Sequence, residues 1–148
     1  MGDYYKKIRN ELGMSRSAVE KKIYGIPAYR LARIENGEYR IHPDEVVALA
    51  ECYGRPDMRN YYCCNECPIG KIDTNEVEYN DNVHEVLVDM AVSLRNVNHQ
   101  KMRLMEILND RKVSSDENAD FQKIFDELEH ISDTIEALQM WCEKENLT

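Results

Sequence analysis

The sequence predicts an all-α protein in which a compact five-helix domain is followed by a long antiparallel helical hairpin. Short amphipathic stretches separated by Gly and Pro fill residues 3–62, which is the pattern of short helices. Two longer stretches within residues 82–142 carry apolar residues at alternating spacings of four and three. Only six Gly and four Pro occur in 148 residues, so little of the chain is forced into loops.

The short helices are placed by residues that begin or end helices. Residues 3–12 form the first, with Tyr5, Ile8 and Leu12 on one face. Ser15 or Ser17 begins the second, and Pro27 suits the first position of the third because it has no N–H to leave unpaired. The five predicted helices are residues 3–12, 15–24, 27–36, 43–53 and 57–62.

The two long stretches have the heptad spacing of coiled coils. Asn82 and Ser114 are the expected caps at their starts, and the short connection near residues 111–115 requires the helices to run antiparallel. In the first stretch Lys101 interrupts the predicted apolar seam of Val83, Leu87, Met90, Leu94, Val97, Leu104 and Leu108. The second seam is Phe121, Ile124, Leu128, Ile131, Ile135, Leu138 and Cys142.

A two-helix hairpin has no closed core, so a second layer must cover it. If the two seams pair with each other, flanking apolar residues stay exposed, including Val86, Met105, Phe125 and Trp141. The N-terminal domain or a second chain would supply the layer. We favour the second chain, which predicts a homodimer formed through residues 81–148.

Charge divides the chain in the same way as the helix pattern. Residues 1–71 carry 12 Lys and Arg against 10 Asp and Glu, whereas residues 72–148 carry 7 against 18. Residues 4–40 alone have 9 basic and 4 acidic side chains. Phosphate binding depends on the local potential, because salt screens charges beyond about 10 Å. We therefore predict a domain at residues 1–70, a linker at 71–80 and a dimerisation region at 81–148.

Residues 15–36 read as helix, glycine turn and helix, and they end in Arg33-Ile34-Glu35-Asn36-Gly37. With the flanking stretches 8–15 and 43–50, this segment resembles the Xre-type, phage-repressor-like helix-turn-helix family over about residues 4–56. The resemblance implies double-stranded DNA as the partner. It also implies a structural ion pair between Arg9 and Glu35 that ties the first helix to the third.

By position in that family, the third helix reads bases in the major groove through Ala28, Tyr29 and Arg33. An arginine can pair bidentately with guanine, which contributes about 1–3 kcal/mol of discrimination. Phosphate contacts position a protein on DNA without specifying its sequence. The candidates for those contacts are Arg16, Ser17, Lys22, Arg30 and Arg40.

The cysteines form half of a metal motif. Cys63, Cys64 and Cys67 stand together, and Cys64 and Cys67 have the spacing of a zinc knuckle. No second pair of ligands follows, so we favour a structural turn with buried thiols and predict no metal and no cofactor. A metal site, completed by Cys52, His42, His84 or a partner chain, and a redox-sensing dithiol are the alternatives.

Other classes of function find little support. No apolar run approaches the roughly 18 residues of a membrane span, and no signal peptide begins the chain, which predicts a cytoplasmic protein without membrane association. No catalytic constellation can be assembled, so an enzyme is not expected. The prediction is a sequence-specific transcriptional regulator, a dimeric repressor that reads a pseudo-palindromic operator. The alternative is an adaptor or antitoxin-like module that acts through the acidic hairpin and responds to thiol chemistry or metal.

Overall fold

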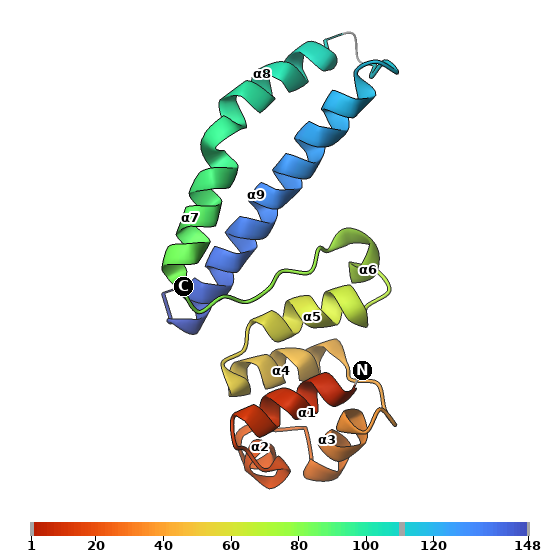
Figure 1. The fold of residues 1–148 in the computed structure, drawn as a ribbon. Coiled ribbons are helices and arrows are strands. Elements are labelled where there is room, and N and C mark those ends of the chain that lie inside the picture. Colours follow the sequence, from red (N-terminus) through yellow and green to blue (C-terminus); the bar gives the residue numbers. More distant parts are fainter. Residues whose placement is uncertain (1, 110–111, 148) are drawn as a thin grey trace. The chain divides into compact units, whose positions relative to one another are not determined.

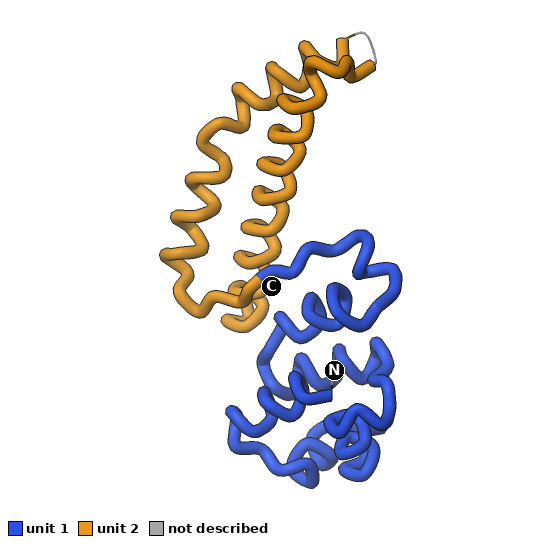
Figure 2. Tube along the Cα trace, turned by 45° about the vertical axis from the view of Figure 1, so that its right-hand side comes forward, with its two compact units in different colours: residues 1–77 blue, residues 78–148 orange. Residues whose placement is uncertain are grey.

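The computed structural model describes residues 2–109 and 112–147, and across these residues the chain forms helices and no strand. The all-α class and a long C-terminal helix are therefore confirmed. The chain divides into two compact units, unit 1 at residues 1–77 and unit 2 at residues 78–148 (Figure 2). Each unit is described separately.

Unit 1 contains the five predicted helices and a short sixth one (Figure 1). The fifth helix is longer than predicted, so Cys63 and Cys64 lie in its last turn rather than in a loop. The helices are α1 (Gly2–Glu11), α2 (Arg16–Lys22), α3 (Ala28–Glu35), α4 (Pro43–Tyr53), α5 (Asp57–Asn65) and α6 (Gly70–Asp73).

Local hydrogen bonds explain where α2 and α3 begin. The Ser15 hydroxyl accepts the N–H of Ala18 at 3.1 Å, so Ser15 is the N-cap of α2. Pro27 is the N-cap of α3, one position before the first helical residue where we expected it. Its extended backbone ends the turn, and its carbonyl accepts the N–H of Leu31 at 3.0 Å.

Side chains from α1 to α5, and from the stretches that join α2, α3 and α4, form one closed apolar core in unit 1. Leu12, predicted on the core face of the first helix, is instead exposed, because α1 ends at Glu11 and Leu12 follows the helix. The core residues are Tyr5, Ile8, Val19, Ile23, Ile26, Leu31, Ile34, Ile41, Val46, Leu49, Ala50, Tyr53 and Met58.

A buried amide is among the contacts by which residues 70–77 pack against α5. The side chain of Asn60 donates to the carbonyl of Asn75 at 2.9 Å and accepts the N–H of Val77 at 3.0 Å. Val77 is buried in turn. This stretch overlaps residues 71–80, whose role as a linker remains a prediction.

Unit 2 is a pair of helical segments in which α9 runs antiparallel to α7 and α8 (Figure 1). Three contacts across the pair occur in opposite chain order on the two sides: Asp81 with Lys144, Ser93 with Thr134, and Arg103 with Asp120. The segments are α7 (Val83–Ser93), the 3-10 turn η1 (Leu94–Asn96), α8 (Val97–Ile107) and α9 (Asn118–Lys144).

Three boundaries in unit 2 differ from the sequence pattern or fall outside the described residues. The first predicted long helix is divided by η1. The second begins at Asn118 rather than after Ser114, whose hydroxyl instead donates to the Glu117 carboxylate in the turn before the helix. The connection predicted near residues 111–115 includes residue 111, which lies outside the described residues.

The first side of unit 2, α7 to α8, was predicted to contribute two columns of residues, each spaced by seven, to the seam with α9. One column is as predicted, and the other is replaced by the column one residue earlier in the chain. The column with Val83, Met90, Val97 and Leu104 is half-buried, as expected. The other buried or half-buried column contains Val86, Ser93, Gln100 and Ile107 instead of Leu87, Leu94, Lys101 and Leu108. The expectation that Val86 is exposed is therefore wrong, and Trp141 is half-buried.

Lys101 gives a physical reason for this register. The predicted column would place its ammonium group between the helices, and a buried, unpaired charge is costly. The observed column places the neutral side chain of Gln100 there, and Lys101 stays exposed. The consequence is that the leucines of the predicted column lie outside the seam.

These displaced residues form an apolar flank on one side of unit 2. In an antiparallel pair, the position next to the seam on one helix lies on the same side as the equivalent position on the other. Leu87, Leu94 and Leu108 are 38–45% exposed, as are Leu128 and Ile135 on α9. The opposite side carries the ion pair between Asp89 and His130. We call the first side the apolar flank; it comprises Leu87, Leu94, Met105, Leu108, Phe125, Leu128 and Ile135.

None of the described helices combines the length and hydropathy that crossing a membrane requires.

Candidate nucleic-acid interface

The α2 and α3 helices are joined by a tight turn whose geometry depends on Gly25. Its φ of 106° lies in the region that glycine adopts far more readily than other residues. Ile23 and Ile26, on either side of the turn, are buried in the core. Helix α3 packs against both α1 and α2. The turn thereby fixes the position of α3 against α2.

A buried carboxylate ties α1 and α2 to the end of α3. Glu35 accepts Arg9 Nε at 2.6 Å and Arg9 Nη2 at 2.9 Å, and the Glu35 side chain has no exposed surface. The structural ion pair implied by the family resemblance is therefore confirmed. Hydrogen bonding to Glu35 raises the pKa of Arg9, although burial opposes that shift. The two side chains are paired inside the domain.

Arg16 shares the same carboxylate. Its Nε donates to Glu35 Oε2 at 2.8 Å, and its side chain is 35% exposed. The sequence analysis placed Arg16 among the phosphate contacts, but its guanidinium is engaged within the domain. A phosphate would reach it only along the part of the side chain that remains exposed.

Arg30 is engaged in a similar way with α4. Its guanidinium makes two hydrogen bonds to Glu45, of which Nη2 to Oε2 measures 2.8 Å. Glu45 also accepts the backbone N–H of His42 at 2.8 Å. Burial alone would raise the pKa of Glu45, but these hydrogen bonds lower it overall. The pair connects α3 to the start of α4 and directs Arg30 away from the outer face of α3.

The outer face of α3 presents two of the three predicted base-reading residues. Leu31, Ile34 and Glu35 are buried, so the opposite face of the helix carries Tyr29 and Arg33, which are four residues apart. Tyr29 is 69% exposed and the Arg33 side chain 48%. Ala28, at the first helical position, is half-buried at the edge of this face.

Arg33 contacts the residues that follow the helix. Its Nε donates to Glu38 Oε2 at 3.1 Å, and its Nη1 donates to the Tyr39 hydroxyl at 2.5 Å. Its guanidinium carbon lies 4.5 Å from the centre of the Tyr39 ring. The side chain is therefore exposed but held in place.

The remaining predicted phosphate contacts, Ser17, Lys22 and Arg40, are all exposed. Lys22 lies near Cys52 of α4. Burial raises the pKa of the Cys52 thiol, and the positive charge of Lys22 partly offsets that rise. These three side chains come from α2 and from the stretch between α3 and α4.

The sequence analysis did not identify Glu38 and Tyr39 as part of this site. The available signal was Asn36-Gly37, which indicates a helix end where the chain turns back. Such a reversal places the next residues beside the last turn of α3.

The cysteine cluster lies at the end of α5 and just after it. Cys64 Sγ is 3.6 Å from both Asn60 Oδ1 and the carbonyl oxygen of Thr74, and Cys67 Sγ accepts the N–H of Gly70 at 3.5 Å. Within residues 2–109 and 112–147, no three His, Cys, Asp or Glu side chains are grouped to hold a metal ion. The contacts of Cys64 and Cys67 contribute to the packing of α5 against residues 70–74.

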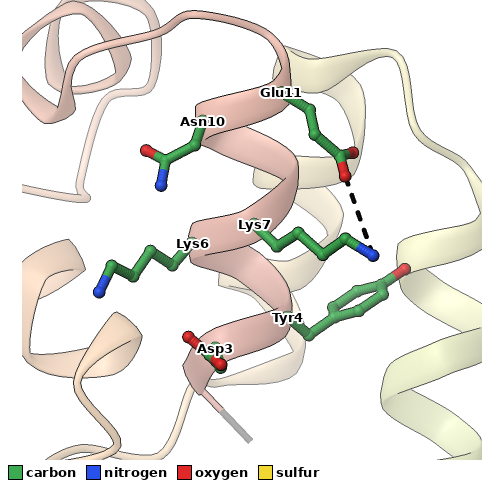
Figure 3. Close-up of a pocket in the computed structure, with 6 residues that line it drawn as sticks. All are labelled: Asp3, Tyr4, Lys6, Lys7, Asn10 and Glu11. Carbon is green, nitrogen blue, oxygen red and sulfur yellow. Dashed lines mark ion pairs between the residues drawn. The ribbon is translucent and has the colours of Figure 1, made fainter.

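A shallow hollow of about 480 Å³ lies along α1 (Figure 3). Lys7 and Glu11 form an ion pair at 3.9 Å on one side of it, and Lys6 and Asn10 extend from the other side of the helix (Figure 3). Both signs of charge are present and the hollow is open to solvent. It has the character of a solvated helix face, and we assign it no ligand.

A tight helical pair fixed by Gly25 and Glu35, with Tyr29 and Arg33 on the exposed face of its second helix, defines the class of helix-turn-helix domains. Residues 6–57 match the family model described as helix-turn-helix. The resemblance to the Xre-like, phage-repressor-like helix-turn-helix family that the sequence predicts is therefore confirmed over this stretch. Neither the curated proteins nor the solved structures yield a match to the chain.

Proposed function

We propose that this protein is a sequence-specific transcriptional regulator that binds a pseudo-palindromic DNA site as a homodimer. The observation that carries the proposal is the outer face of α3, where Tyr29 and Arg33 are exposed while the rest of the helix is fixed by Arg9, Glu35 and Arg30. A recognition helix must be rigid and must present its polar face to the major groove. The contacts that hold α3 and the exposure of Tyr29 and Arg33 support this role for the helix.

The base contacts proposed are those of Ala28, Tyr29 and Arg33, and the phosphate contacts those of Ser17, Lys22 and Arg40. Arg16 and Arg30 are proposed as weaker phosphate contacts, because Glu35 and Glu45 already neutralise much of their charge. Phosphate contacts make the affinity fall as salt increases, since each one releases counterions from the DNA.

The apolar flank of unit 2 supports the homodimer. Unit 2 places Ser93, Gln100 and Thr134 in its seam and leaves leucines exposed on the flank. A second layer would bury those leucines, and a second copy of the same pair forms a four-helix bundle. Homodimers use one patch twice, so a single apolar flank is sufficient.

The dimer fixes what the DNA site looks like. Two recognition helices related by a twofold axis require two half-sites in inverted orientation, with centres about 34 Å apart or a multiple of that distance. We further propose that the protein acts in the cytoplasm as a repressor, by occupying a site that the transcription machinery needs. No separate activating domain is proposed for unit 2.

The test of DNA binding is selection from a random-sequence pool at two salt concentrations. Wild type, Arg33→Ala and Arg95→Ala are compared; Arg95 is an exposed arginine of unit 2. We expect wild type and Arg95→Ala to enrich the same inverted repeat, and Arg33→Ala to lose about 1–3 kcal/mol of discrimination at one position of each half-site. Failure of wild type to enrich any sequence, even at low salt, would rule out the proposal.

The test of dimerisation compares two substitutions two residues apart, at the end of α7 and the start of η1. Leu94→Asp places a charge on the apolar flank, whereas Val92→Asp places one at an exposed apolar residue away from it. Sedimentation should show a dimer for wild type and Val92→Asp, and a monomer for Leu94→Asp. Equal effects of the two substitutions would contradict the assignment of the flank.

The alternative function, an adaptor or antitoxin-like module, depends on the acidity of residues 72–148, which carry 18 acidic and 7 basic side chains. An adaptor would bind its partner protein equally well after Arg33→Ala. It would also show no affinity for DNA at low salt. The selection experiment therefore separates the two functions.

A further inference from the structure

We infer that Glu38 and Tyr39 are positioning residues that orient Arg33 for reading guanine. The inference rests on the proposed function, and it adds two residues outside the recognition helix to the specificity of the site. It is carried by the way the chain turns back at the end of α3, by the contacts made to Arg33, and by the donors that those contacts leave unused.

The turn at the end of α3 brings both residues to Arg33. Gly37, at φ 74°, is in the left-handed conformation, and its N–H donates to the carbonyl of Ile34 at 3.0 Å. The N–H of Glu38 donates to the carbonyl of Arg33 at 2.9 Å. These two bonds define the Schellman motif, in which the chain reverses direction over the last helical turn. The N–H of Tyr39 also donates to the Arg33 carbonyl, at 3.2 Å.

The side chains then contact the guanidinium group from two directions. Glu38 accepts Nε at 3.1 Å, and the Tyr39 hydroxyl accepts Nη1 while its ring faces the guanidinium carbon at 4.5 Å. Glu38 is itself within 3.4 Å of the Asn36 side-chain amide, which donates to Oε1. Arg33 is therefore held by a short chain of interactions that begins at the helix cap.

The N–H donors of Arg33 that Glu38 and Tyr39 leave unused are sufficient for a bidentate contact to guanine. A guanidinium group has five N–H donors, and a bidentate contact to guanine N7 and O6 uses two of them. Glu38 and Tyr39 occupy the Nε hydrogen and one Nη1 hydrogen. The second Nη1 hydrogen and both Nη2 hydrogens are left, and they form the end of the group that can pair with a base.

Holding the side chain favours specificity because a mobile arginine loses rotamer freedom on binding. A carboxylate at this place also has a cost, since it repels the phosphates that the rest of the domain attracts. The two effects have opposite signs in binding. A neutral residue at position 38 should weaken the preference for guanine and, at the same time, strengthen binding to unrelated DNA.

The experiment measures the affinity of the full chain for its selected DNA site, for the same site with the guanine facing Arg33 replaced, and for unrelated DNA. The variants are Glu38→Gln, Tyr39→Phe, Tyr39→Leu and Arg33→Ala, with Glu20→Gln as the control, because Glu20 is an exposed carboxylate on α2. We expect Glu38→Gln and Tyr39→Leu to reduce the preference for guanine at least fivefold. Tyr39→Phe, which keeps the ring, should reduce it less, and Glu20→Gln should leave it unchanged.

A double-mutant cycle separates positioning from a general effect on folding. In the Arg33→Ala background, Glu38→Gln should change the base preference no further, because the group that it positions is gone. An unchanged preference for guanine in Glu38→Gln and Tyr39→Leu, with wild type still selecting its site, would overturn the inference and leave the proposed function intact. If wild type selects no site, the proposed function fails and this inference fails with it.

Discussion

The two units of the chain differ in which charged and apolar side chains they bury and which they expose. Unit 1 buries Arg9, Glu35 and Glu45 and surrounds them with a closed apolar core. Unit 2 keeps its ion pairs at the surface and exposes leucines along one flank. Buried charges are acceptable in unit 1 because each has a partner with good geometry. The difference is that unit 1 has a closed apolar core, whereas the exposed leucines of unit 2 lie together along one flank.

Polar groups between the helices extend this comparison. In unit 1 the buried Asn60 amide both donates and accepts hydrogen bonds. In unit 2 the oxygen of Gln100 is buried in the seam with no hydrogen-bond partner among the described residues. An unpaired buried polar atom costs about 1–3 kcal/mol. The Gln100 oxygen therefore weakens the pairing within unit 2, although unit 1 also holds buried side-chain oxygens without a hydrogen-bond partner among the described residues, such as the Tyr53 hydroxyl.

The largest expected effect breaks unit 1 and leaves unit 2 folded. Glu35→Ala removes the partner of Arg9, whose side chain is only 9% exposed, and should cost about 3–5 kcal/mol of unfolding free energy. Urea unfolding followed by circular dichroism should show an early loss of part of the helix signal. Fluorescence of Trp141, the only tryptophan in the chain and a residue of unit 2, should keep its wild-type transition.

Glu20→Ala is the control for this experiment, since it removes an exposed carboxylate from α2. Its unfolding curve should match that of wild type. A shift of the Trp141 transition in Glu35→Ala would mean that the two units unfold together, and the comparison between them would no longer hold.

A smaller effect, of about 1–2 kcal/mol, is expected when the ion pair between Arg30 and Glu45 is removed by Glu45→Gln. The pKa of Glu45 is lowered in the folded protein from its ordinary 4.5, so the unfolded chain takes up the proton first as pH falls. The stabilisation is present above that ordinary value and is lost as pH falls through the lower, folded value.

Urea unfolding of unit 1 between pH 7 and pH 3 tests this. The free energy of unfolding of wild type should exceed that of Glu45→Gln at pH 7, and this difference should disappear as the pH decreases. Glu51→Gln changes an exposed carboxylate of the same helix, and its free energy of unfolding should differ from that of wild type by the same amount at every pH in this range. A constant offset for Glu45→Gln as well would show that the pair contributes no pH dependence.

The smallest expected effect is a gain in the stability of unit 2 when a buried polar group in its seam is removed. Gln100→Leu replaces an unpaired buried amide with an apolar side chain of similar length and should stabilise unit 2 by about 1 kcal/mol. Trp141 fluorescence in urea measures the gain. Gln122→Leu, at an exposed position on α9, should give none. A loss of stability in Gln100→Leu would mean that the amide is paired in solution.

The sequence predicted unit 1 more completely than unit 2, for a physical reason. In unit 1, Ser15, Pro27 and Gly37 mark helix ends by local backbone rules, so their roles follow from residue type. In unit 2 each helix carries apolar residues at three positions of the heptad, and a pair of helices buries only two of them. Spacing alone does not say which; the charge of Lys101 beside Gln100 distinguishes them.

In the candidate nucleic-acid interface, too, some features follow from local sequence rules and others depend on tertiary packing. The exposure of Tyr29 and Arg33 follows from helical periodicity once Leu31 and Ile34 are assigned to the core. The engagement of Arg30 by Glu45 does not, because the two residues are 15 positions apart and meet only when α3 packs near the start of α4. Contacts of that kind depend on tertiary structure and leave no periodic signal.

The exposed leucines of the apolar flank have a consequence for how such a regulator responds to its own supply. The dimer proposed for this flank would form in proportion to the square of the monomer concentration while monomers predominate. Only that dimer would offer two recognition helices to the proposed inverted repeat. A twofold rise in synthesis would then raise occupancy of the DNA site by up to fourfold, which gives the cell a steep dose response without any small-molecule signal.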